Sequence, residues 1–518
     1  MFLITSAAYI TSGLATEYGR IPPSFLPLQN KRLYEHQLAL LKPDEAIVLS
    51  LPAGFVISEK DNEILELHKV IIVYVPEGFS LGQSIVYVLN VTARYNEPLN
   101  ILHGDTLFES IPWKPDAYLI GKASDNYPWA SSEDIKNDEF VYAGYFSFSN
   151  QSLLIKSITE SNYDFVNGIL LYKHRKEVKE EMSDTWLDFG HANTYYRSRT
   201  HLTTQRFFND LKIDGFSVIK YSNDNNKIQA EANWFSNMPV ALKRYIPALW
   251  NSGTDLNKSF YQIEYFYLSS LAELYVYGKN EFFIWQNILS ACNEFLMDCM
   301  KFTAPVQLNI AEKANRLYSE KTLLRLQTYA KETGIDLDRG WIYNGIHIPS
   351  LNTMVEELNS FISVPSIDQQ SIIHGDFGFS NILYDFRTKS IKVIDPRGID
   401  VEGNQTIYGD IRYDIAKLAH SVMGMYDFII AGYFSYVEEG EYNIKFSVFS
   451  NPTIEKIQDF FKTNSFAGMN IREACTFPIL VHLFLSMLPL HKDNLLRQKA
   501  MLANAFRLYL EFREFKEK

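Results

Sequence analysis

The chain has 518 residues, a length that usually forms roughly two to four domains. Hydrophobic residues make up 47% and charged residues 21%, which is typical of a globular protein with more than one apolar core. The formal net charge of -12 argues against a nucleic-acid-binding protein, because such proteins usually carry a basic face.

The cysteines, the N-terminus and the apolar runs bear on the cellular compartment of the protein. Cys292, Cys299 and Cys475 show neither CxxC spacing nor histidine partners at zinc spacing, so we expect buried thiols in a reducing compartment. The N-terminus lacks the basic region of a secretory signal. The longest apolar run, Phe477–Leu490, is too short to span a bilayer and is expected to be a buried helix. These features predict a cytoplasmic protein without a membrane span.

The chain changes character along its length. Short apolar strands alternate with helical or loop stretches early on, which predicts an α/β domain over residues 1–200. The predicted strands are Met1–Ser6, Ala46–Leu51, Lys69–Val75, Leu99–Leu102, Ala117–Ile120 and Gly168–Tyr172. A second domain is predicted over 201–518, with a strand-rich lobe at about 205–275 and a helical lobe at about 280–518. Nothing at 190–205 looks like a flexible spacer, so the sequence sets this boundary only approximately.

Three stretches of the first domain follow a recognisable order. An opening strand is followed from Arg20 by RIPPSFLPLQNKRLYEHQL, Leu99–Phe108 is a strand ending in Gly-Asp, and Thr185–Tyr195 reads TWLDFGHANTY. In this order they resemble the nucleotidyltransferases that make activated sugars and CDP-alcohols, whose fold is Rossmann-like (GT-A-like). The resemblance implies that Asp105 and Asp188 hold one Mg²⁺ against CTP or another NTP. It also implies that Arg20 supplies positive charge to the phosphates.

The phosphate-binding part of this pattern departs from the family. A glycine-rich loop should wrap the triphosphate with backbone N–H groups. Residues 7–20 instead read AAYITSGLATEYGR, in which Gly13 and Gly19 are far apart, and Pro23 or Ser24 stands where a lysine is expected. The domain is therefore either an active nucleotidyltransferase or a degenerate domain retained for substrate binding, assembly or stability.

Two histidines accompany the carboxylates of this domain. The tripeptide His-Gly-Asp that begins at His103 is also a kinase signature, but Ser110 rather than Asn follows five residues after Asp105. No hairpin with a second carboxylate follows either, so this stretch is not predicted to be a kinase site. His191 is expected to be a polar neighbour of Asp188, and a contact with substrate remains the alternative.

A lysine and a glutamate mark the strand-rich lobe. The strand Phe216–Lys220 ends in lysine, and Glu231 is predicted to begin the helical run EANWFSNM. The connection to the helical lobe is expected at Tyr261–Leu268. No GxGxxG loop precedes the lysine, so the turn that covers the phosphates is expected within Phe207–Gly215.

The strongest signal is the segment Ser371–Gly398, SIIHGDFGFSNILYDFRTKSIKVIDPRG. It places Asn381 five residues after Asp376 and a further carboxylate, Asp395, after a β-hairpin. Phosphoryl transfer to a hydroxyl needs a carboxylate that accepts the proton and oxygen ligands for Mg²⁺. We therefore predict Asp376 as the catalytic base and Asn381 and Asp395 as metal ligands. The alternative, a loop network with Asp395 capping a turn, accounts for single residues but not for their order.

This HGDxxxxN…D pattern resembles the aminoglycoside phosphotransferase and choline kinase superfamily, which has a protein-kinase-like bilobal α+β fold. HGD stands in place of HRD, and Asp-Pro-Arg in place of DFG, which indicates a small-molecule rather than a protein substrate. The resemblance implies ATP as co-substrate, with Lys220 at its α/β phosphates and Glu231 orienting that lysine. Asp414, in GDIRYDIAKLAH, resembles the aspartate that braces the catalytic loop.

Together the two resemblances predict a bifunctional enzyme that activates a small alcohol or sugar for a bacterial surface polysaccharide (capsule or lipopolysaccharide). The C-terminal kinase would phosphorylate a hydroxyl, and the N-terminal domain would then join the product to a nucleotide. Two alternatives stay open: a kinase with an inactive nucleotidyltransferase-like scaffold domain, and a choline or ethanolamine kinase fused to a cytidylyltransferase. Aminoglycoside resistance is disfavoured because it leaves the first domain without a role. The expected partners are nucleotides and a small-molecule substrate, and the sequence leaves the oligomeric state open.

Overall fold

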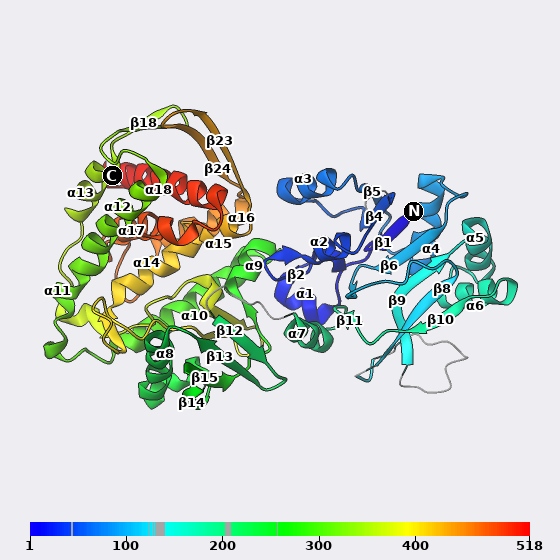
Figure 1. The fold of residues 1–518 in the computed structure, drawn as a ribbon, viewed down its shortest axis with the longest axis horizontal. Coiled ribbons are helices and arrows are strands. Elements are labelled where there is room, and N and C mark those ends of the chain that lie inside the picture. Colours follow the sequence, from blue (N-terminus) through cyan, green and yellow to red (C-terminus); the bar gives the residue numbers. More distant parts are fainter. Residues whose placement is uncertain are drawn as a thin grey trace. The chain divides into compact units, whose positions relative to one another are not determined.

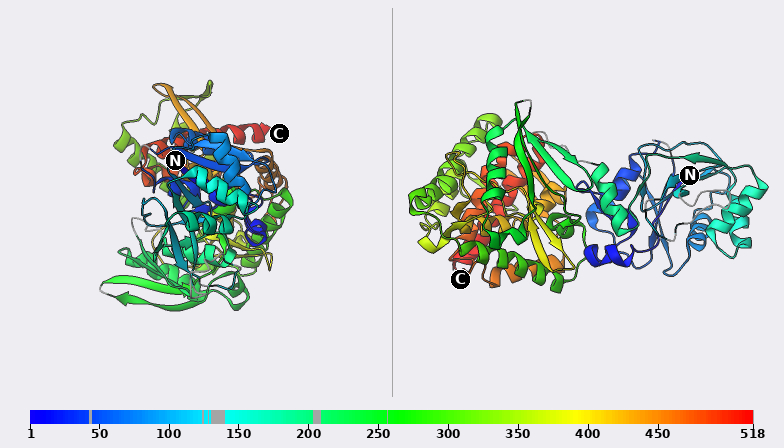
Figure 2. Two further views of the ribbon diagram at one scale, coloured as in Figure 1. Left: turned by 90° about the vertical axis from the view of Figure 1, so that its right-hand side faces the viewer. Right: turned by 90° about the horizontal axis from the view of Figure 1, so that it is seen from below.

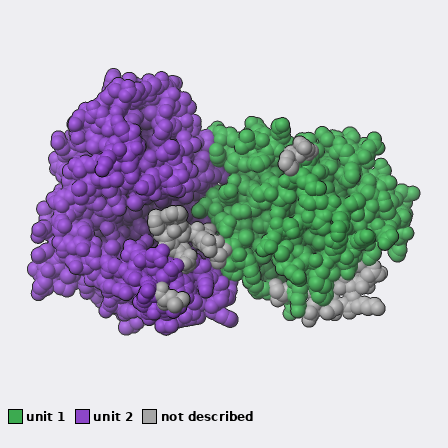
Figure 3. Space-filling view, viewed as in Figure 1, with its two compact units in different colours: residues 1–202, 277–279 green, residues 203–276, 280–518 purple. Residues whose placement is uncertain are grey.

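The computed structural model describes residues 1–42, 45–123, 125–127, 129, 140–202, 209–255 and 257–517. The chain forms two compact units, which Figure 3 shows in different colours. Unit 1 comprises Met1–Leu202 with Tyr277–Lys279, and unit 2 comprises Thr203–Val276 with Asn280–Lys518. The start of the predicted strand-rich lobe and of the predicted phosphate-covering turn falls at residues 203–208, outside the described residues.

Unit 1 is built on a seven-stranded mixed sheet of order β10-β8-β9-β6-β1-β4-β5 (Figure 1). Its strands are β1 (Phe2–Thr5), β4 (Ile47–Pro52), β5 (Ile71–Val75), β6 (Leu99–His103), β8 (Ala117–Lys122), β9 (Phe140–Phe148) and β10 (Lys179–Met182). The strands β6, β1, β4 and β5 run parallel to one another, whereas β9 runs antiparallel to both neighbours. Two short ribbons, β2 (Pro27–Leu28) with β3 (Lys31–Arg32) and β7 (Thr106–Leu107) with β11 (Leu187–Asp188), flank this sheet.

Helices of unit 1 bury one face of this sheet. Its helices are α1 (Ser12–Tyr18), α2 (Leu33–Leu38), α3 (Glu59–Leu67), α4 (Leu81–Thr92), α5 (Gln151–Glu160), α6 (Phe165–Arg175) and α7 (Ala192–His201). The apolar residues of α4, α5 and α6 form one core with side chains from β1, β4, β5, β6, β8 and β9. Figures 1 and 2 show α5 and α6 side by side. The inner strands β1, β4, β6, β8 and β9 are buried along most of their length, whereas the edge strands β5 and β10 are more exposed.

The predicted strand Gly168–Tyr172 is wrong, because these residues lie inside α6. The side chain of Asp164 caps this helix by accepting a hydrogen bond from the Asn167 amide. The buried positions Phe165, Gly168, Ile169 and Tyr172 recur at helical spacing. A Cβ at Gly168 would lie 2.8 Å from Ile158 Cγ1, so glycine lets α6 approach α5 closely. A five-residue apolar run fits a strand and a helix equally well, and the packing decides between them.

Unit 2 begins with a four-stranded antiparallel sheet of order β12-β13-β15-β14. The strands are β12 (Asn209–Ile213), β13 (Ser217–Ser222), β14 (Leu249–Asp255) and β15 (Lys258–Glu264), and α8 (Asn225–Asn237) packs against the last three. The side chain of Asp214 accepts hydrogen bonds from the Phe216 and Ser217 amides and so fixes the β12–β13 turn.

The rest of unit 2 is dominated by helices, with short sheets between them (Figure 1). The helices are α9 (Leu271–Tyr277), α10 (Phe282–Met300), α11 (Ile310–Asn315), α12 (Lys321–Thr333), α13 (Leu351–Asn359), α14 (Ile411–Val422), α15 (Tyr426–Ile430), α16 (Pro452–Thr463), α17 (Thr476–Met487) and α18 (Leu495–Glu517). The strands are β16 (Ser269–Ser270), β17 (Trp341–Tyr343), β18 (Ile346–Ile348), β19 (Gln370–Ile372), β20 (Ile382–Asp385), β21 (Ser390–Val393), β22 (Tyr408–Asp410), β23 (Phe434–Gly440) and β24 (Asn443–Val448). The helix α17 is buried along nearly its whole length, as its apolar sequence predicted.

The predicted fold class is confirmed for both parts of the chain: an α/β unit with a largely parallel central sheet, then a bilobal α+β unit. The hairpin β20–β21 forms where the sequence predicted it. All three cysteines are buried and free, as expected. Within the described ranges, no helix is long and apolar enough to cross a membrane.

Candidate functional site

Lys220 lies at the centre of a buried ion cluster in unit 2. Its Nζ donates to Glu231 Oε2 at 2.7 Å and to Asp395 Oδ1 at 3.1 Å. Tyr261, which faces Lys220 across the β13–β15 pair, donates its hydroxyl to the same Glu231 oxygen at 2.8 Å. Lys220 and Glu231 are only 4% and 1% exposed, so the ion pair is shielded from water. The structure thus brings three of the predicted site residues together.

The helix α8 carries Glu231 to this position. The helix begins at Asn225 and is capped by Asp224, so the prediction that Glu231 begins it is wrong; that glutamate lies in the middle of the helix. At Gly398, φ is +65° and a Cβ would lie 2.3 Å from the Ala230 carbonyl oxygen. Only glycine therefore lets the turn after Asp395 pack against α8.

The charges of this cluster depend on one another. Burial lowers the pKa of Lys220, but the carboxylates of Asp395 and Glu231 outweigh burial and raise it above its ordinary value. Burial raises the pKa of Glu231, and the Lys220 ammonium opposes that shift. Each charge is therefore stabilised by its partner, and removing Lys220 would leave the buried Glu231 carboxylate without its closest ion-pair partner.

Asp376 stands on the loop between β19 and β20 and pairs with a lysine. Its Oδ1 lies 2.8 Å from Lys417 Nζ, and Asn381 Nδ2 donates to its Oδ2 at 3.0 Å and to its backbone oxygen at 2.9 Å. The side chain is 46% exposed, so a ligand can reach it. Burial raises the pKa of Asp376, but the Lys417 ammonium outweighs it and holds the pKa well below the ordinary value. The carboxylate is therefore ionised at neutral pH.

Buried groups fix the shape of the Asp376 loop. The carboxylate of Asp414 accepts hydrogen bonds from the amides of His374 (2.6 Å) and Gly375 (2.8 Å), which is the bracing position expected from the sequence. Burial raises the pKa of Asp414 to about 7. Burial also lowers the pKa of His374 to about 4, so its neutral ring can donate from Nε2 to the Ile394 carbonyl 2.9 Å away. Rigid loops of this kind can hold reacting groups in register.

The oxygen atoms at this site suit magnesium. Asn381 offers an amide oxygen beside Asp376, and Asp395 offers a carboxylate that is 36% exposed. Asp395 has φ +56°, an uncommon conformation for a residue other than glycine that recurs at functional sites. Within the described ranges, no three His, Cys, Asp or Glu side chains form a metal-binding group. Magnesium is commonly held by one or two protein oxygens, with phosphate and water completing its shell, so these residues fit it.

Two carboxylates meet in unit 1. Asp105 follows β6, and Asp188 ends β11, whose partner strand begins at Thr106. A Cβ at Gly190 would lie 2.6 Å from Asp105 Oδ2 and 3.4 Å from Asp188 Oδ1, so glycine keeps the space beside both carboxylates clear. Burial and the Asp188 charge raise the pKa of Asp105 to about 6. As expected, His191 is a neighbour of Asp188, with Nδ1 3.0 Å from Oδ2.

Arg20 does not join these carboxylates. Its guanidinium pairs with Glu77 at 2.7 Å and lies over the Tyr9 ring at 4.0 Å. No ion pair links it to Asp105 or Asp188 in the described part of the chain. The segment that should form the glycine-rich loop contains α1 instead, with Gly13 inside the helix and Gly19 (φ +73°) at its end.

A cavity of about 190 Å³ opens beside Asp188 in unit 1. Its lining combines aromatic side chains with basic ones. The lining residues are Lys122, Trp129, Trp186, Leu187, Asp188, Thr194, Arg197, Ser198 and His201.

Sequence reasoning missed two residues that contact the predicted groups. Lys417 lies one helical turn after Asp414 on α14, a spacing that places both on the face toward the loop. Tyr261 could have been found from pairing, since it lies directly opposite Lys220 in the antiparallel register.

No protein-family model matches this sequence, and no curated protein matches it. Solved structures match its two parts separately. A UDP-glucose pyrophosphorylase complexed with UDP-glucose is 13% identical, and the match covers 39% of this chain and 97% of that one (TM-score 0.29). An inositol-1-phosphate CTP transferase from T. maritima is 15% identical and is matched over 38% and 94% (TM-score 0.29). Both match the N-terminal part of the chain.

The C-terminal part is similar to aminoglycoside phosphotransferases. A thermostable mutant of APH(4)-Ia in a ternary complex with ADP and hygromycin B is 12% identical, and the match covers 59% of this chain and 92% of that one (TM-score 0.37). At these identities the similarity concerns the fold alone.

Proposed function

We propose that unit 2 is a small-molecule kinase that transfers the γ-phosphoryl group of ATP to a hydroxyl. The observation that carries this proposal is the 3.1 Å contact between Lys220 Nζ and Asp395 Oδ1, two residues 175 positions apart in the sequence. The same carboxylate is placed after the loop of Asp376 and Asn381 by the hairpin β20–β21. A phosphate-binding lysine, a metal-binding carboxylate and a base are the groups that phosphoryl transfer requires.

Each residue has one task in this proposal. Lys220 binds the α/β phosphates of ATP, and Glu231 keeps the ammonium in place. Asp376 orients the acceptor hydroxyl and takes its proton as the bond to phosphorus forms and the bond to the ADP oxygen breaks. Asn381 and Asp395 hold Mg²⁺, whose contribution when bound is to neutralise charge on the phosphates.

The test is phosphoryl transfer from γ-labelled ATP to a panel of sugars, polyols and amino alcohols. Asp376→Asn keeps the size of the side chain and removes the proton acceptor, so transfer should fall about 100- to 10,000-fold. Transfer that continues unchanged in this variant would refute the assignment. Binding of an ATP analogue should survive the substitution, since it depends on Lys220 and the metal-binding residues.

A second activity, nucleotidyl transfer by unit 1, is favoured by the Asp105–Asp188 pair. The clear space at Gly190 and the absence of a lysine or arginine ion pair to either carboxylate, within the described residues, are what a cation site between them needs. The phosphorylated product of unit 2 would attack the α-phosphate of CTP or another NTP and release pyrophosphate. Such a pair of reactions would produce an activated building block, as surface polysaccharide synthesis requires.

The test of unit 1 is pyrophosphate release from CTP, UTP or GTP in the presence of each phosphorylated product. Release that is lost in Asp105→Ala supports nucleotidyl transfer. No release with any combination favours the alternative, in which unit 1 is a binding or scaffold domain. The α1 segment in place of a glycine-rich loop is the observation behind that alternative.

A further inference from the structure

Four basic side chains of the helical lobe of unit 2 lie near one another, and one of them, Lys417, pairs with Asp376. They are Lys321, Arg325, Arg397 and Lys417 (the basic cluster). We infer that this cluster binds an anionic group, a phosphate or a carboxylate, on the acceptor substrate. The inference rests on the proposed kinase function and adds the chemical class of the acceptor.

The aromatic ring of Tyr413 organises one half of the basic cluster. Tyr413 and Lys417 are one turn apart on α14, and the lysine reaches Asp376 Oδ1 at 2.8 Å. The guanidinium of Arg397 lies over the Tyr413 ring, 5.6 Å from its centroid. The Cβ of Arg397 also packs against the catalytic loop, since a Cβ at Gly375 would be 2.7 Å from it. Both cations therefore flank the loop that presents Asp376.

The other half comes from the start of α12. Tyr318, in the turn before this helix, stacks on Tyr413 with ring centroids 6.1 Å apart. Lys321 follows three residues later and Arg325 four residues after that, so helical spacing places all three on one side. Arg325 donates to the Ser486 carbonyl at 2.7 Å, which anchors its side chain. The ring stack thus brings the basic face of α12 next to Lys417 and Arg397.

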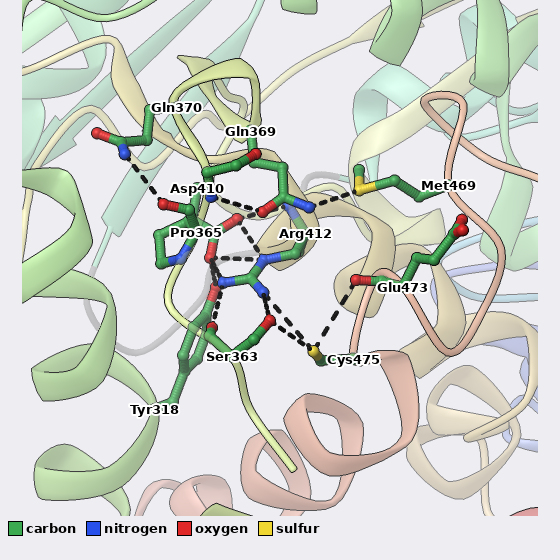
Figure 4. Close-up of polar contacts among 11 residues, drawn as sticks. Tyr318, Ser363, Pro365, Gln369, Gln370, Asp410, Arg412, Met469, Glu473 and Cys475 are labelled. Carbon is green, nitrogen blue, oxygen red and sulfur yellow. Dashed lines mark hydrogen bonds and ion pairs between the residues drawn. The ribbon is translucent and has the colours of Figure 1, made fainter.

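The buried carboxylates of Asp410 and Asp414 already accept hydrogen bonds from other groups. Asp410 is buried and accepts hydrogen bonds from the Arg412 guanidinium and, at 2.8 Å, from the Tyr318 hydroxyl (Figure 4). Arg412 in turn donates to Ser363. Asp414 is fully buried and occupied by two backbone amides. In the described part of the chain, neither Lys321 nor Arg397 makes an ion pair with a carboxylate, and Asp376 already pairs with Lys417.

An excess of basic over acidic side chains is unfavourable unless a bound anion offsets the positive charge. Cations that are partly withdrawn from water are normally paired, and unpaired like charges repel one another. Burial lowers the pKa of Lys321 to about 6; the charges of Arg397, Arg325 and Lys417 add to this shift, and the Asp376 carboxylate opposes it. A bound phosphate or carboxylate would relieve the repulsion and would accept charge-assisted hydrogen bonds.

The position of the cluster favours the acceptor over ATP. In-line transfer places the acceptor hydroxyl and the leaving oxygen on opposite sides of the moving phosphoryl group. Lys220 and Glu231 would bind ATP from the strand-rich lobe. Lys321, Arg325 and Lys417 instead stand on α12 and α14 of the helical lobe, where Lys417 pairs with the base. Positively charged acceptors such as choline, ethanolamine and aminoglycosides are disfavoured by the same charges.

The test compares acceptors that differ in charge. A suitable panel is glycerol 3-phosphate, glycerate, glycerol and ethanolamine, together with a hexose, its 6-phosphate, its uronate and its amino sugar. The expected result is that kcat/KM is highest for a phosphorylated or carboxylated member. Comparing the phosphates with the carboxylates shows which of these two anions the site prefers. Lys321→Met should raise the KM for that acceptor about 10- to 100-fold, since a charge-assisted hydrogen bond is lost, and leave the KM for ATP within about twofold.

Lys331→Met is the matched control, because this exposed lysine stands on another face of the same helix and should leave both KM values unchanged. A neutral or cationic best acceptor would overturn the inference while leaving the kinase intact. So would a rise in the KM for ATP alone, which would assign the cluster to the nucleotide. If no member is phosphorylated, calorimetry with the same compounds decides. Anion binding that is lost in Lys321→Met supports the anion site independently of the kinase, and no binding of any anionic member refutes the anion site.

Discussion

The carboxylates of the two units stand in opposite electrostatic surroundings. In unit 2, Asp376 pairs with Lys417, and the Lys417 ammonium holds its pKa low against the effect of burial. In unit 1, burial and the neighbouring Asp188 raise the pKa of Asp105 to about 6. Neither carboxylate of unit 1 has a lysine or arginine ion-pair partner among the described residues. The catalytic carboxylate proposed for unit 2 therefore has a lysine partner before any ligand binds, whereas in unit 1 the cationic partner described is the imidazole of His191 at Asp188.

The sharpest test of this difference removes the central lysine of unit 2. Lys220→Met leaves Glu231 buried without its partner and takes a donor from the phosphates, so kcat should fall about 100- to 1000-fold. Steady-state phosphoryl transfer measures the effect. Nucleotidyl transfer by unit 1, where it is detected, should not change.

The control for this variant is Lys243→Met, which removes an exposed lysine from the same lobe and should change kcat less than twofold. A kcat that stays at the wild-type level in Lys220→Met would mean that the ion cluster is only structural. The stability of the folded protein, followed by thermal unfolding, separates that outcome from a general loss of structure.

A smaller effect is expected from the lysine that sequence reasoning missed. Lys417→Met removes the charge that keeps the pKa of Asp376 low, so the acid limb of the pH–rate profile should move to higher pH. Since the carboxylate is about half exposed, the loss of kcat at pH 7 should be only roughly tenfold. Lys417→Arg keeps the charge and should keep the acid limb in place. An unmoved limb in Lys417→Met would show that Asp376 does not set it.

The sequence could predict those features whose residues lie close together along the chain. Asp376, Asn381 and Asp395 lie within one loop and one hairpin, so their order along the chain already implies their proximity. Lys220 and Glu231 were predicted because a strand and the following helix commonly form such a pair in this fold. These are the parts of unit 2 that local spacing determines.

Other features depend on tertiary packing and left no such signal. The basic cluster forms because Tyr318 stacks on Tyr413, two residues 95 positions apart that no local pattern connects. The apolar run Gly168–Tyr172 was predicted as a strand because its helical form depends on close contact with α5. The contact of the Arg20 guanidinium with Glu77, a loop residue whose position depends on the folded sheet, left no local signal either, and the role of Arg20 at the phosphates stays a prediction.

The smallest expected effect is on stability, and it has opposite signs in the two units. The pKa of Asp105 is raised in the folded protein, so this group favours folding below about pH 4, and that contribution is lost as pH rises through about 6. Asp105→Asn should therefore stabilise unit 1 at pH 8 in the absence of Mg²⁺. After discounting for solvent screening, the gain is about 1 kcal/mol, and it should be smaller at pH 5.

Asp376 has a lowered pKa, so it contributes stability above its unfolded pKa, and Asp376→Asn should destabilise unit 2 slightly. Hydrogen exchange of the β1, β4 and β6 amides reports on unit 1, and exchange of the β13 and β15 amides reports on unit 2. Adding Mg²⁺ should protect unit 1 in the wild type but not in Asp105→Asn, because the carboxylate pair is then incomplete. If Asp105→Asn instead destabilised unit 1 at pH 8, the ionised Asp105 carboxylate would be stabilised by its contacts in the protein and would not need a bound cation. The scaffold alternative would then be the better account of unit 1.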